Sequence, residues 1–447
     1  MASRTICFTI QVTLVVAFLT TKVVLSDDTV PIPANKAQLG EWYNTNVGPL
    51  DQRKSTVDPA LVTAEEGAKV VKVMQDGSGE FKTITDAIKS IPSGNTKRVI
   101  IYIGAGNYNE KIKIEKTKPF VTLYGVPEKM PNLTFGGTAQ QYGTVDSATL
   151  IVESDYFVAA NIMISNTAPR PDPKTPGGQA VALRISGDKA AFYNCKMYGF
   201  QDTICDDRNR HFFKDCLIQG TMDYIFGSGK SLYVSTELRT LGDNGITVIV
   251  AQARKSETED NAYSFVHCDV TGTGTGTFLG RAWMSHPRVV FAYSNMSDIV
   301  NKLGWSNNNH PEHDKTVRFG EYQNSGPGAD PKGRATITKQ LSETEVKPYI
   351  TLAMIEGSKW LLPPPTPKGN GTLCCFFFLF LFKIQQVGPL SSVESASDAD
   401  IKSSRESTSG SGSSSSSGKS GASTAGSGGN PSGFCSRSSS EDDTSIT

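Results

Sequence analysis

The sequence predicts an all-β fold, a right-handed parallel β-helix with one short N-terminal capping helix. The main observation is an internal repeat. The segment FYNCKMYG at 192–199 recurs 21 residues later as FKDCLIQG at 213–220, and FVHCDVTG at 265–272 is a third copy. A fixed period near 20 residues is typical of solenoids that stack one supersecondary unit per turn. A β-sandwich would not explain this constant phase.

Short β-rich runs broken by turn residues support the same fold. Such runs occupy 99–103, 121–124, 149–152, 157–164 and 180–185, with Gly, Asn, Asp or Pro between them. Few intervals have the length and period of a crossover helix, which argues against a doubly wound α/β fold. The 42 glycines and 23 prolines also suit a chain with many turns.

The charge composition argues against one broad class of function. The 447 residues include 44 basic and 44 acidic side chains, so the formal net charge is zero. A nucleic-acid-binding protein would normally carry a basic excess. The length suits one large domain with extra segments, because elongated solenoids exceed the usual length of a domain.

The first residues, 1–26, resemble a secretory signal peptide. A basic start is followed by a mostly apolar stretch at 6–25 and by the small residue Ser26. The alternative is a membrane anchor, but polar residues such as Lys22 dilute the stretch and favour cleavage. Three glycosylation sequons fit a secreted protein, at Asn132, Asn295 and Asn370.

The main domain is predicted at 66–365, after a polar lead-in at 27–65. It begins with a strand near 70–74, and residues 81–91 place apolar side chains at helical spacing. We expect this helix to cover the end of the solenoid.

The tail, 366–447, does not continue the pattern. Its apolar run at 374–382 is too short to cross a bilayer, so no stable membrane anchor is expected. The Ser/Gly-rich part from about Ser391 is predicted to be disordered. One hypothesis is that the tail arises from an altered or mispredicted reading of the end of the gene.

The eight cysteines fit no zinc-binding pattern. Cys195, Cys216 and Cys268 occupy the same repeat position, which allows either a disulfide or a ladder of buried thiols. We favour the ladder. Cys205 has no evident partner in the sequence.

Asp202 and Asp223 lie 21 residues apart, at matching points of the repeat. In a stacked β-coil, equivalent residues lie about 4.8 Å apart, the spacing of neighbouring strands. A single Asp after a Gly is usually a solvated turn residue, but two adjacent carboxyls cannot both ionise freely. Such a pair can supply a nucleophile or base and an acid from one residue type. The spacing alone would also suit a retaining glycosidase.

Five segments resemble the signature blocks of plant pectin methylesterases (pectinesterases). They occur in the family's order and span about 70–360, namely GNYNEK at 106–111, GQAVAL at 178–183, GFQDT at 199–203, DYIFG at 223–227 and LGRAW at 279–283. The resemblance implies a right-handed parallel β-helix, in agreement with the repeat. The roughly 40 residues between the signal and the main domain are too few for the family's inhibitor-like pro-region, so the chain resembles the short class.

The resemblance also implies roles for individual residues. Asp223 would be the nucleophile, and Asp202 would act first as an acid and then as a base. Gln201 and Gln179 would hydrogen-bond the tetrahedral oxyanion, since amide donors stabilise charge without losing a proton. Arg281 would pair with Asp223 and keep it ionised.

Trp283 and Trp305 are half of the four tryptophans, and the resemblance implies aromatic residues along the substrate cleft. Both are therefore expected to contact the sugar chain, together with Gln179 and Arg281. The alternative for each tryptophan is packing in the core.

Four other residues are not assigned a catalytic role. Glu110 belongs to a block that more often stabilises a coil turn. Tyr224 replaces the Phe more usual in its block, and its added hydroxyl should be tolerated. His211 and His267 have no triad context, and the chain contains no Gly-x-Ser-x-Gly elbow typical of serine esterases.

The resemblance implies an ester hydrolase that removes methyl groups from cell-wall pectin, releasing methanol without a cofactor or metal. The expected partners are methyl-esterified homogalacturonan and a separate pectinesterase inhibitor protein, and the enzyme would be a secreted monomer of the cell wall. The alternatives are a polygalacturonase, a pectate lyase or a non-catalytic wall-binding β-helix. A lyase would need a cluster of carboxylates for calcium.

Overall fold

Parallel strands form the framework of the chain, which a computed structural model describes at residues 28–172, 176–243 and 246–367. The predicted signal peptide, the apolar run at 374–382, the Ser/Gly-rich tail and the sequon at Asn370 lie outside these residues. Within the described ranges, no helix has the length and hydropathy needed to cross a membrane.

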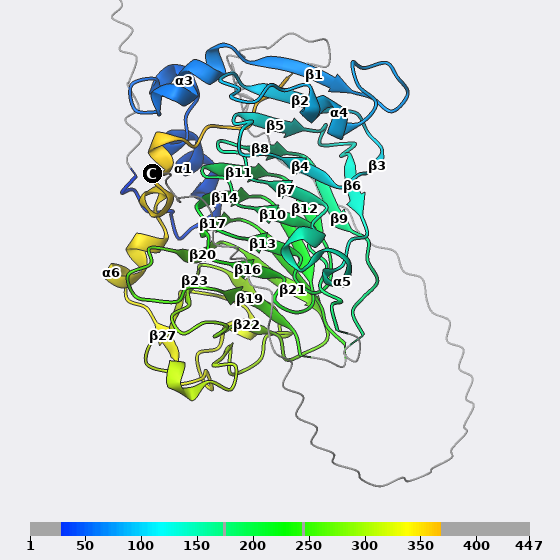
Figure 1. The fold of residues 1–447 in the computed structure, drawn as a ribbon. Coiled ribbons are helices and arrows are strands. Elements are labelled where there is room, and N and C mark those ends of the chain that lie inside the picture. The colour runs from blue at the N-terminus through cyan, green and yellow to red at the C-terminus, as the bar shows by residue number, and fades with distance from the viewer. Residues whose placement is uncertain (1–27, 173–175, 244–245, 368–447) are drawn as a thin grey trace, which may run out of the picture. The chain divides into compact units, whose positions relative to one another are not determined.

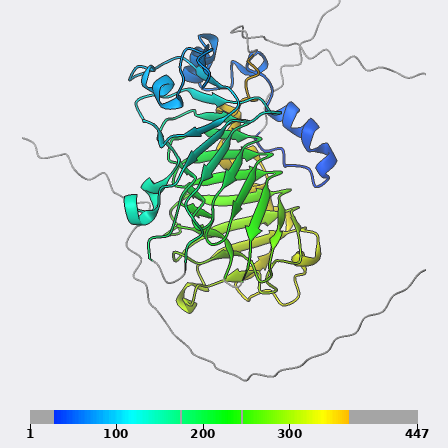
Figure 2. The same cartoon turned by 90° about the vertical axis from the view of Figure 1, so that its right-hand side faces the viewer.

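Between residues 99 and 322 the chain passes repeatedly through three parallel sheets in a fixed order, which confirms the predicted parallel β-helix (Figures 1 and 2). Sheet A contains β1 (Lys69–Val73), β2 (Val99–Ile103), β5 (Val121–Tyr124), β8 (Val158–Ala160), β11 (Ala190–Tyr193), β14 (Arg210–Lys214), β17 (Lys230–Val234), β20 (Ala262–Val266), β23 (Arg288–Ala292), β26 (Arg318–Tyr322) and β27 (Thr338–Gln340). Sheet B contains β3 (Asn107–Asn109), β6 (Asn132–Phe135), β9 (Met163–Asn166), β12 (Lys196–Tyr198), β15 (Leu217–Gly220), β18 (Glu237–Leu241), β21 (Asp269–Thr273) and β24 (Asn295–Met296). Sheet C contains β4 (Ile112–Ile114), β7 (Leu150–Val152), β10 (Leu183–Ile185), β13 (Ile204–Asp206), β16 (Ile225–Gly227), β19 (Val248–Gln252), β22 (Phe278–Arg281) and β25 (Trp305–Ser306).

The helices are short and lie outside the sheets. The α-helices are α1 (Leu39–Asn46), α2 (Leu50–Arg53), α3 (Pro59–Glu66), α4 (Ile84–Lys89), α5 (Ala139–Tyr142) and α6 (Glu343–Val346). The 3-10 turns are η1 (Lys36–Gln38), η2 (Val145–Ser147), η3 (Pro311–His313), η4 (Pro327–Ala329), η5 (Lys347–Tyr349), η6 (Leu352–Ile355) and η7 (Gly357–Lys359).

A column of aromatic rings in the core explains the sequence repeat. Phe192 pairs in register with Phe213 and their rings stack at 4.6 Å, but the next ring is Tyr233, at 4.5 Å from Phe213. Phe265 stacks on Tyr233 at 4.6 Å. One coil, which carries Tyr233 in place of Phe, therefore lies between the second and third copies of the repeat.

The repeated cysteines form a column of buried thiols. Cys195, Cys216 and Cys268 are all free and buried, which confirms the predicted ladder. The strand registers place Thr236 between Cys216 and Cys268. These small side chains fill the interior beside the aromatic column.

The predicted capping helix is α4. Its apolar side chains, Ile84, Ala87 and Ile88, are buried in the main core. The carboxylate of Glu110 accepts hydrogen bonds from the backbone N–H groups of Ile84 (3.0 Å) and Thr85 (2.8 Å). An acidic group at this end satisfies free N–H groups and complements the helix dipole. Glu110 therefore joins the capping helix to the next coil.

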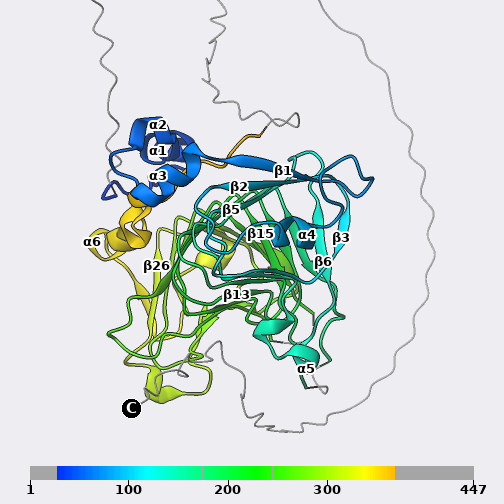
Figure 3. The same ribbon diagram turned by 45° about the horizontal axis from the view of Figure 1, so that its top comes forward.

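The lead-in contains helices that the sequence analysis did not predict. Figure 3 shows α1, α2 and α3 beside the C-terminal helix α6, next to sheet A. Trp42, Tyr43 and Leu61 belong to a second apolar cluster that also contains Phe212 of β14 and Leu352 of η6. Burial of this apolar surface fixes both ends of the described chain on the outer face of sheet A.

Candidate active site

The two aspartates occupy equivalent turns that lead from sheet B into sheet C. Asp202 lies between β12 and β13, and Asp223 lies between β15 and β16. The register of Ile204 with Ile225 places the two turns on adjacent coils, and Asp202 N–H donates to Met222 O at 3.0 Å. Both aspartates have left-handed backbone conformations, with φ of 65° and 48°. Aspartate tolerates this region better than most residues, so the same turn can repeat with its carboxyl retained.

Arg281 of β22 contacts only the second carboxyl of the pair through hydrogen bonds. Its Nε donates to Oδ1 of Asp223 at 2.8 Å, and its Nη2 donates to Oδ2. Its Nη1 donates to Oδ1 of Asn308 at 2.9 Å, and its guanidinium carbon lies 4.5 Å from the ring centre of Trp283. A bidentate ion pair of this kind fixes both the charge and the direction of a carboxylate.

The surroundings give the two carboxyls different proton affinities. Asp202 is 9% exposed and Asp223 is 5% exposed. Burial raises the pKa of Asp202 well above its usual value, and the negative charge of Asp223 raises it further. Burial also raises the pKa of Asp223, but the charge and hydrogen bonds of Arg281 oppose that rise. The pair therefore loses its first proton from Asp223, and Asp202 retains the second.

Two glutamine side chains are available beside the carboxyl pair. Gln201 directly precedes Asp202, and the backbone N–H of Ala180 donates to Gln201 O at 3.2 Å, which places Gln179 on the preceding coil. Both glutamines are partly exposed. Neither side-chain amide has a hydrogen bond to another described residue, so their N–H donors can meet an incoming oxygen.

The two predicted substrate-contacting tryptophans have different environments. Trp283 is partly exposed and lies against Arg281. Trp305, by contrast, is 1% exposed, stacks on Phe319 at 4.4 Å and donates its indole N–H to Glu321 at 3.0 Å. The prediction that Trp305 contacts the substrate is therefore wrong, because its strand, β25, turns this side chain into the core.

Asn308 is a site residue that the sequence analysis missed. It follows β25, whose Ser306 pairs in register with Arg281, and its side chain accepts the hydrogen bond from Nη1 of Arg281. Its φ of 57° is left-handed, a region that Asn adopts more readily than most residues. The run of asparagines at 307–309 was the available signal for such a turn.

The remaining candidates are structural. Tyr224 is buried, and its hydroxyl lies 3.2 Å from Oγ1 of Thr240, so the added group is accommodated. His211 does have an acidic partner, since its Nδ1 lies 2.6 Å from Oδ1 of Asp206, but neither residue is exposed. The Nε2 of His267 donates to Pro33 O in the lead-in at 2.7 Å. None of these side chains can meet a polymeric substrate.

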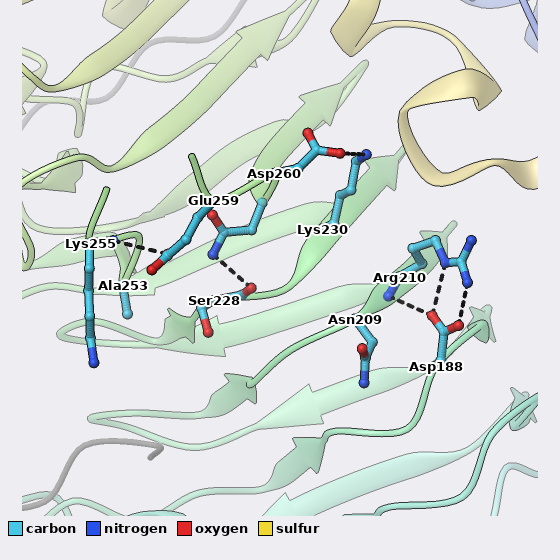
Figure 4. A pocket seen from close by; sticks show the side chains of 10 residues that line it. Asp188, Asn209, Arg210, Ser228, Lys230, Ala253, Lys255, Glu259 and Asp260 are labelled. Atoms are coloured by element: carbon cyan, nitrogen blue, oxygen red, sulfur yellow. Dashed lines mark hydrogen bonds and ion pairs between the residues drawn. The ribbon is translucent and has the colours of Figure 1, made fainter. Parts of the chain in front are cut away.

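A surface pocket of about 440 Å³ lies elsewhere on the coils, at the turns from sheet C to sheet A (Figure 4). Four of its charged side chains form ion pairs, Lys230 with Asp260 at 2.6 Å and Arg210 with Asp188. The pocket contains neither aspartate of the pair. The adjacent carboxyls of Asp202 and Asp223 remain the candidate site.

One group of described side chains could hold a metal ion. His310, Glu312 and His313 have ligand atoms within 4.8 Å of one another, on and beside η3. They do not belong to the carboxyl pair or its hydrogen-bond partners.

Comparison with known proteins identifies the family of the chain. The chain matches the family model described as Pectinesterase over residues 70–358. It is 57% identical over 359 residues to Pectinesterase 2 of Olea europaea, a match that covers 80% of this chain and 98% of that protein. The solved pectin methylesterase from carrot is 31% identical, with a TM-score of 0.61, and the match covers 66% of this chain and 94% of that one. A mutant pectin methylesterase solved in complex with a hexasaccharide is 26% identical, with a TM-score of 0.57 over 68% of this chain and all of that one (100%). The chain belongs to the pectinesterase family.

Proposed function

We propose that this protein hydrolyses methyl esters of pectin and that the paired aspartates carry out the reaction. The observation that carries the proposal is the asymmetry of the pair. Asp223 is held by Arg281 through both oxygens, whereas burial and the neighbouring charge favour the protonated form of Asp202. Two stacked carboxyls in different protonation states suit nucleophilic catalysis with a separate acid.

In the first step, the carboxylate of Asp223 attacks the carbonyl carbon of the methyl ester. The negative charge that develops on the carbonyl oxygen is stabilised by the amides of Gln179 and Gln201. Removal of one such donor typically costs about 10²–10³ in rate. The bond to the methoxy group then breaks, and Asp202 gives its proton to the departing oxygen. The products of this step are methanol, an ionised Asp202 and an anhydride between Asp223 and the galacturonyl group.

In the second step, water attacks the galacturonyl carbon of the anhydride. Asp202 takes a proton from the water, so it returns to its starting state, and the carboxylate of Asp223 leaves. The product is a free galacturonate carboxyl on an unbroken sugar chain. No cofactor or metal ion takes part in either step.

The proposed substrate is the methyl-esterified homogalacturonan of the cell wall. A pectin methylesterase with the same fold has been solved with a bound hexasaccharide, which supports an oligosaccharide-sized substrate cleft. The proposal includes secretion to the wall, action as a monomer, and control by a separate inhibitor protein. The signal-like start supports secretion.

The test is incubation of the purified protein with highly methylated pectin, followed by assays of methanol, chain length and unsaturated ends. The proposal expects methanol without shortening of the chain and without new double bonds. Chain cleavage would support a polygalacturonase, and unsaturated ends would support a lyase. The Asp223→Asn variant is the matched control, and it should release almost no methanol while keeping the wild-type circular dichroism spectrum.

A further inference from the structure

An exposed aromatic side chain lies on a turn from sheet B to sheet C, as the two aspartates of the candidate active site do. Tyr142, at the end of α5, is 45% exposed and is the one aromatic residue among the exposed large hydrophobic side chains of the described ranges. α5 belongs to the turn from β6 to β7, which also leads from sheet B into sheet C. Tyr142 therefore lies on the same class of turn as Asp202 and Asp223, on an earlier coil.

The position of α5 is fixed relative to the oxyanion side of the site. The backbone N–H of Ala139 donates to Gln179 O at 2.8 Å, and that of Gln140 donates to Gly177 O at 2.9 Å. A capping box between Thr138 and Gln141 closes the first turn of the helix. Tyr142 is thus held on a backbone unit that is bonded to the segment of Gln179.

A lysine lies over the ring of Tyr142. The Nζ of Lys111 is 4.2 Å from the ring centre of Tyr142 and 5.5 Å from that of Phe135, and the two rings are 5.8 Å apart. Lys111 Nζ also donates to the backbone oxygen of Asp146. Within the described residues, no carboxylate forms an ion pair with Lys111. The group Lys111, Phe135 and Tyr142, called here the Tyr142 platform, therefore joins an aromatic surface to a cation whose charge is not neutralised by an ion pair.

The strand registers give the separation of the platform from the carboxyl pair. Ile112 pairs with Leu150, Leu150 with Leu183, and Leu183 with Ile204. Lys111 therefore lies three strands from the coil of Asp202, about 14 Å at the usual strand spacing. A single sugar cannot reach from one to the other, but an oligosaccharide that lies across the strands can.

We propose that the Tyr142 platform binds a uronate unit of the pectin chain away from the reacting ester, with the sugar against Tyr142 and its free carboxylate on Lys111. The proposal rests on the proposed function, since it assumes that pectin lies across the turns from sheet B to sheet C. An aromatic face suits the apolar face of a sugar ring, and an unneutralised cation favours a free carboxylate over a methyl ester. The platform thus distinguishes de-esterified units from esterified ones.

The experiment measures binding of oligogalacturonates long enough to span the platform and the carboxyl pair, by calorimetry at low salt. One set of oligomers is fully de-esterified and the other fully methylated, the latter bound to Asp223→Asn. We expect Tyr142→Ala to weaken binding of both sets about fivefold to tenfold. Lys111→Met should weaken binding of the de-esterified set and abolish the preference for it. Lys129→Met and Leu303→Ala, which change exposed residues outside the platform, are the matched controls.

Two outcomes overturn the proposal. One is wild-type affinity of Tyr142→Ala for both sets, and the other is an unchanged preference in Lys111→Met. Methanol release from a short methylated oligomer that cannot reach the platform should stay within twofold of wild type in both variants. This measurement distinguishes failure of the platform proposal from failure of the proposed esterase function. If the protein is not an esterase, the wild type will release no methanol either.

Discussion

Arg281 donates to both carboxylate oxygens of Asp223, and this contact distinguishes Asp223 from Asp202. The two aspartates share the same turn, the same left-handed backbone and nearly the same burial. The guanidinium is placed by β22, two strands beyond β16 in sheet C. A structural repeat therefore supplies two equal carboxyls, and one arginine from the coil of the third repeat copy makes them unequal.

Replacement of Arg281 should change the pH dependence of the reaction. In Arg281→Gln, the charge that opposes the raised pKa of Asp223 is gone, so that pKa rises and the acid limb of kcat/KM moves to higher pH. Arg281→Lys keeps a positive charge but loses the bidentate geometry, so its acid limb should move less than that of Arg281→Gln. Both should lose about 100-fold or more in kcat, because the direction of the nucleophile is no longer fixed. Methanol release measured across pH checks this, and an unmoved acid limb in Arg281→Gln would contradict it.

Asn308 should act through Arg281. Asn308→Gly removes the acceptor of the Nη1 hydrogen bond and retains a residue suited to the left-handed backbone. We expect kcat to fall about tenfold, with little change in KM, since one hydrogen bond to a charged group is lost. Asn309→Gly is the matched control, because Asn309 is exposed and has a similar φ of 61°. Equal kinetics for the two variants would remove Asn308 from the site.

The raised pKa of Asp202 predicts a pH-dependent cost in stability. The folded protein holds this proton above the ordinary aspartate pKa of about 3.9, so stability falls as pH rises from that value through the folded pKa. Asp202→Asn is neutral at every pH and escapes this loss. Its melting temperature should therefore exceed that of the wild type by a margin that widens between pH 4 and pH 7. Asp298→Asn, at an exposed position, should show no such trend, and a constant margin for Asp202→Asn would refute the assignment.

Substitution of Trp305 should affect stability, whereas substitution of Trp283 should affect substrate binding. Trp305→Phe loses the hydrogen bond to the buried Glu321 and should lower the free energy of unfolding by about 1–3 kcal/mol, with KM unchanged. Trp283→Ala should raise KM for pectin and leave the melting temperature close to wild type. Denaturant titrations and methanol kinetics on both variants test this, and a raised KM in Trp305→Phe would restore that residue to the substrate cleft.

The sequence was sufficient to predict the stack of coils, the ladder of thiols and the pair of aspartates, because these features recur at a constant offset. Phe192 and Cys195 recur 21 residues later as Phe213 and Cys216. It was insufficient wherever a residue's direction depends on a neighbouring coil. Trp305 could face the cleft or the core, and only the turn of β25 decides between them.

Other features depend on contacts between distant segments. Asn308 reaches Arg281 from the following coil. The lead-in helices are short, and they owe their burial to Phe212 and the C-terminal turns rather than to a strong periodic pattern. The asparagine run at 307–309 indicates a turn but not its contact with Arg281, and the burial of the lead-in helices has no signature in the local sequence.

The division of labour between the two aspartates is tested most directly by trapping the intermediate. An aryl ester of a galacturonate oligomer needs no proton for its leaving group, so Asp202→Asn should still be acylated by it. Without a base to activate water, the anhydride should accumulate. We predict one equivalent of phenol in a burst, no steady turnover, and an intact mass increased by one galacturonyl oligomer. The double variant Asp202→Asn with Asp223→Asn should show neither burst nor adduct. An adduct that persists in the double variant, or steady turnover without a burst in Asp202→Asn, would contradict the assignment of Asp223 as nucleophile and Asp202 as acid and base.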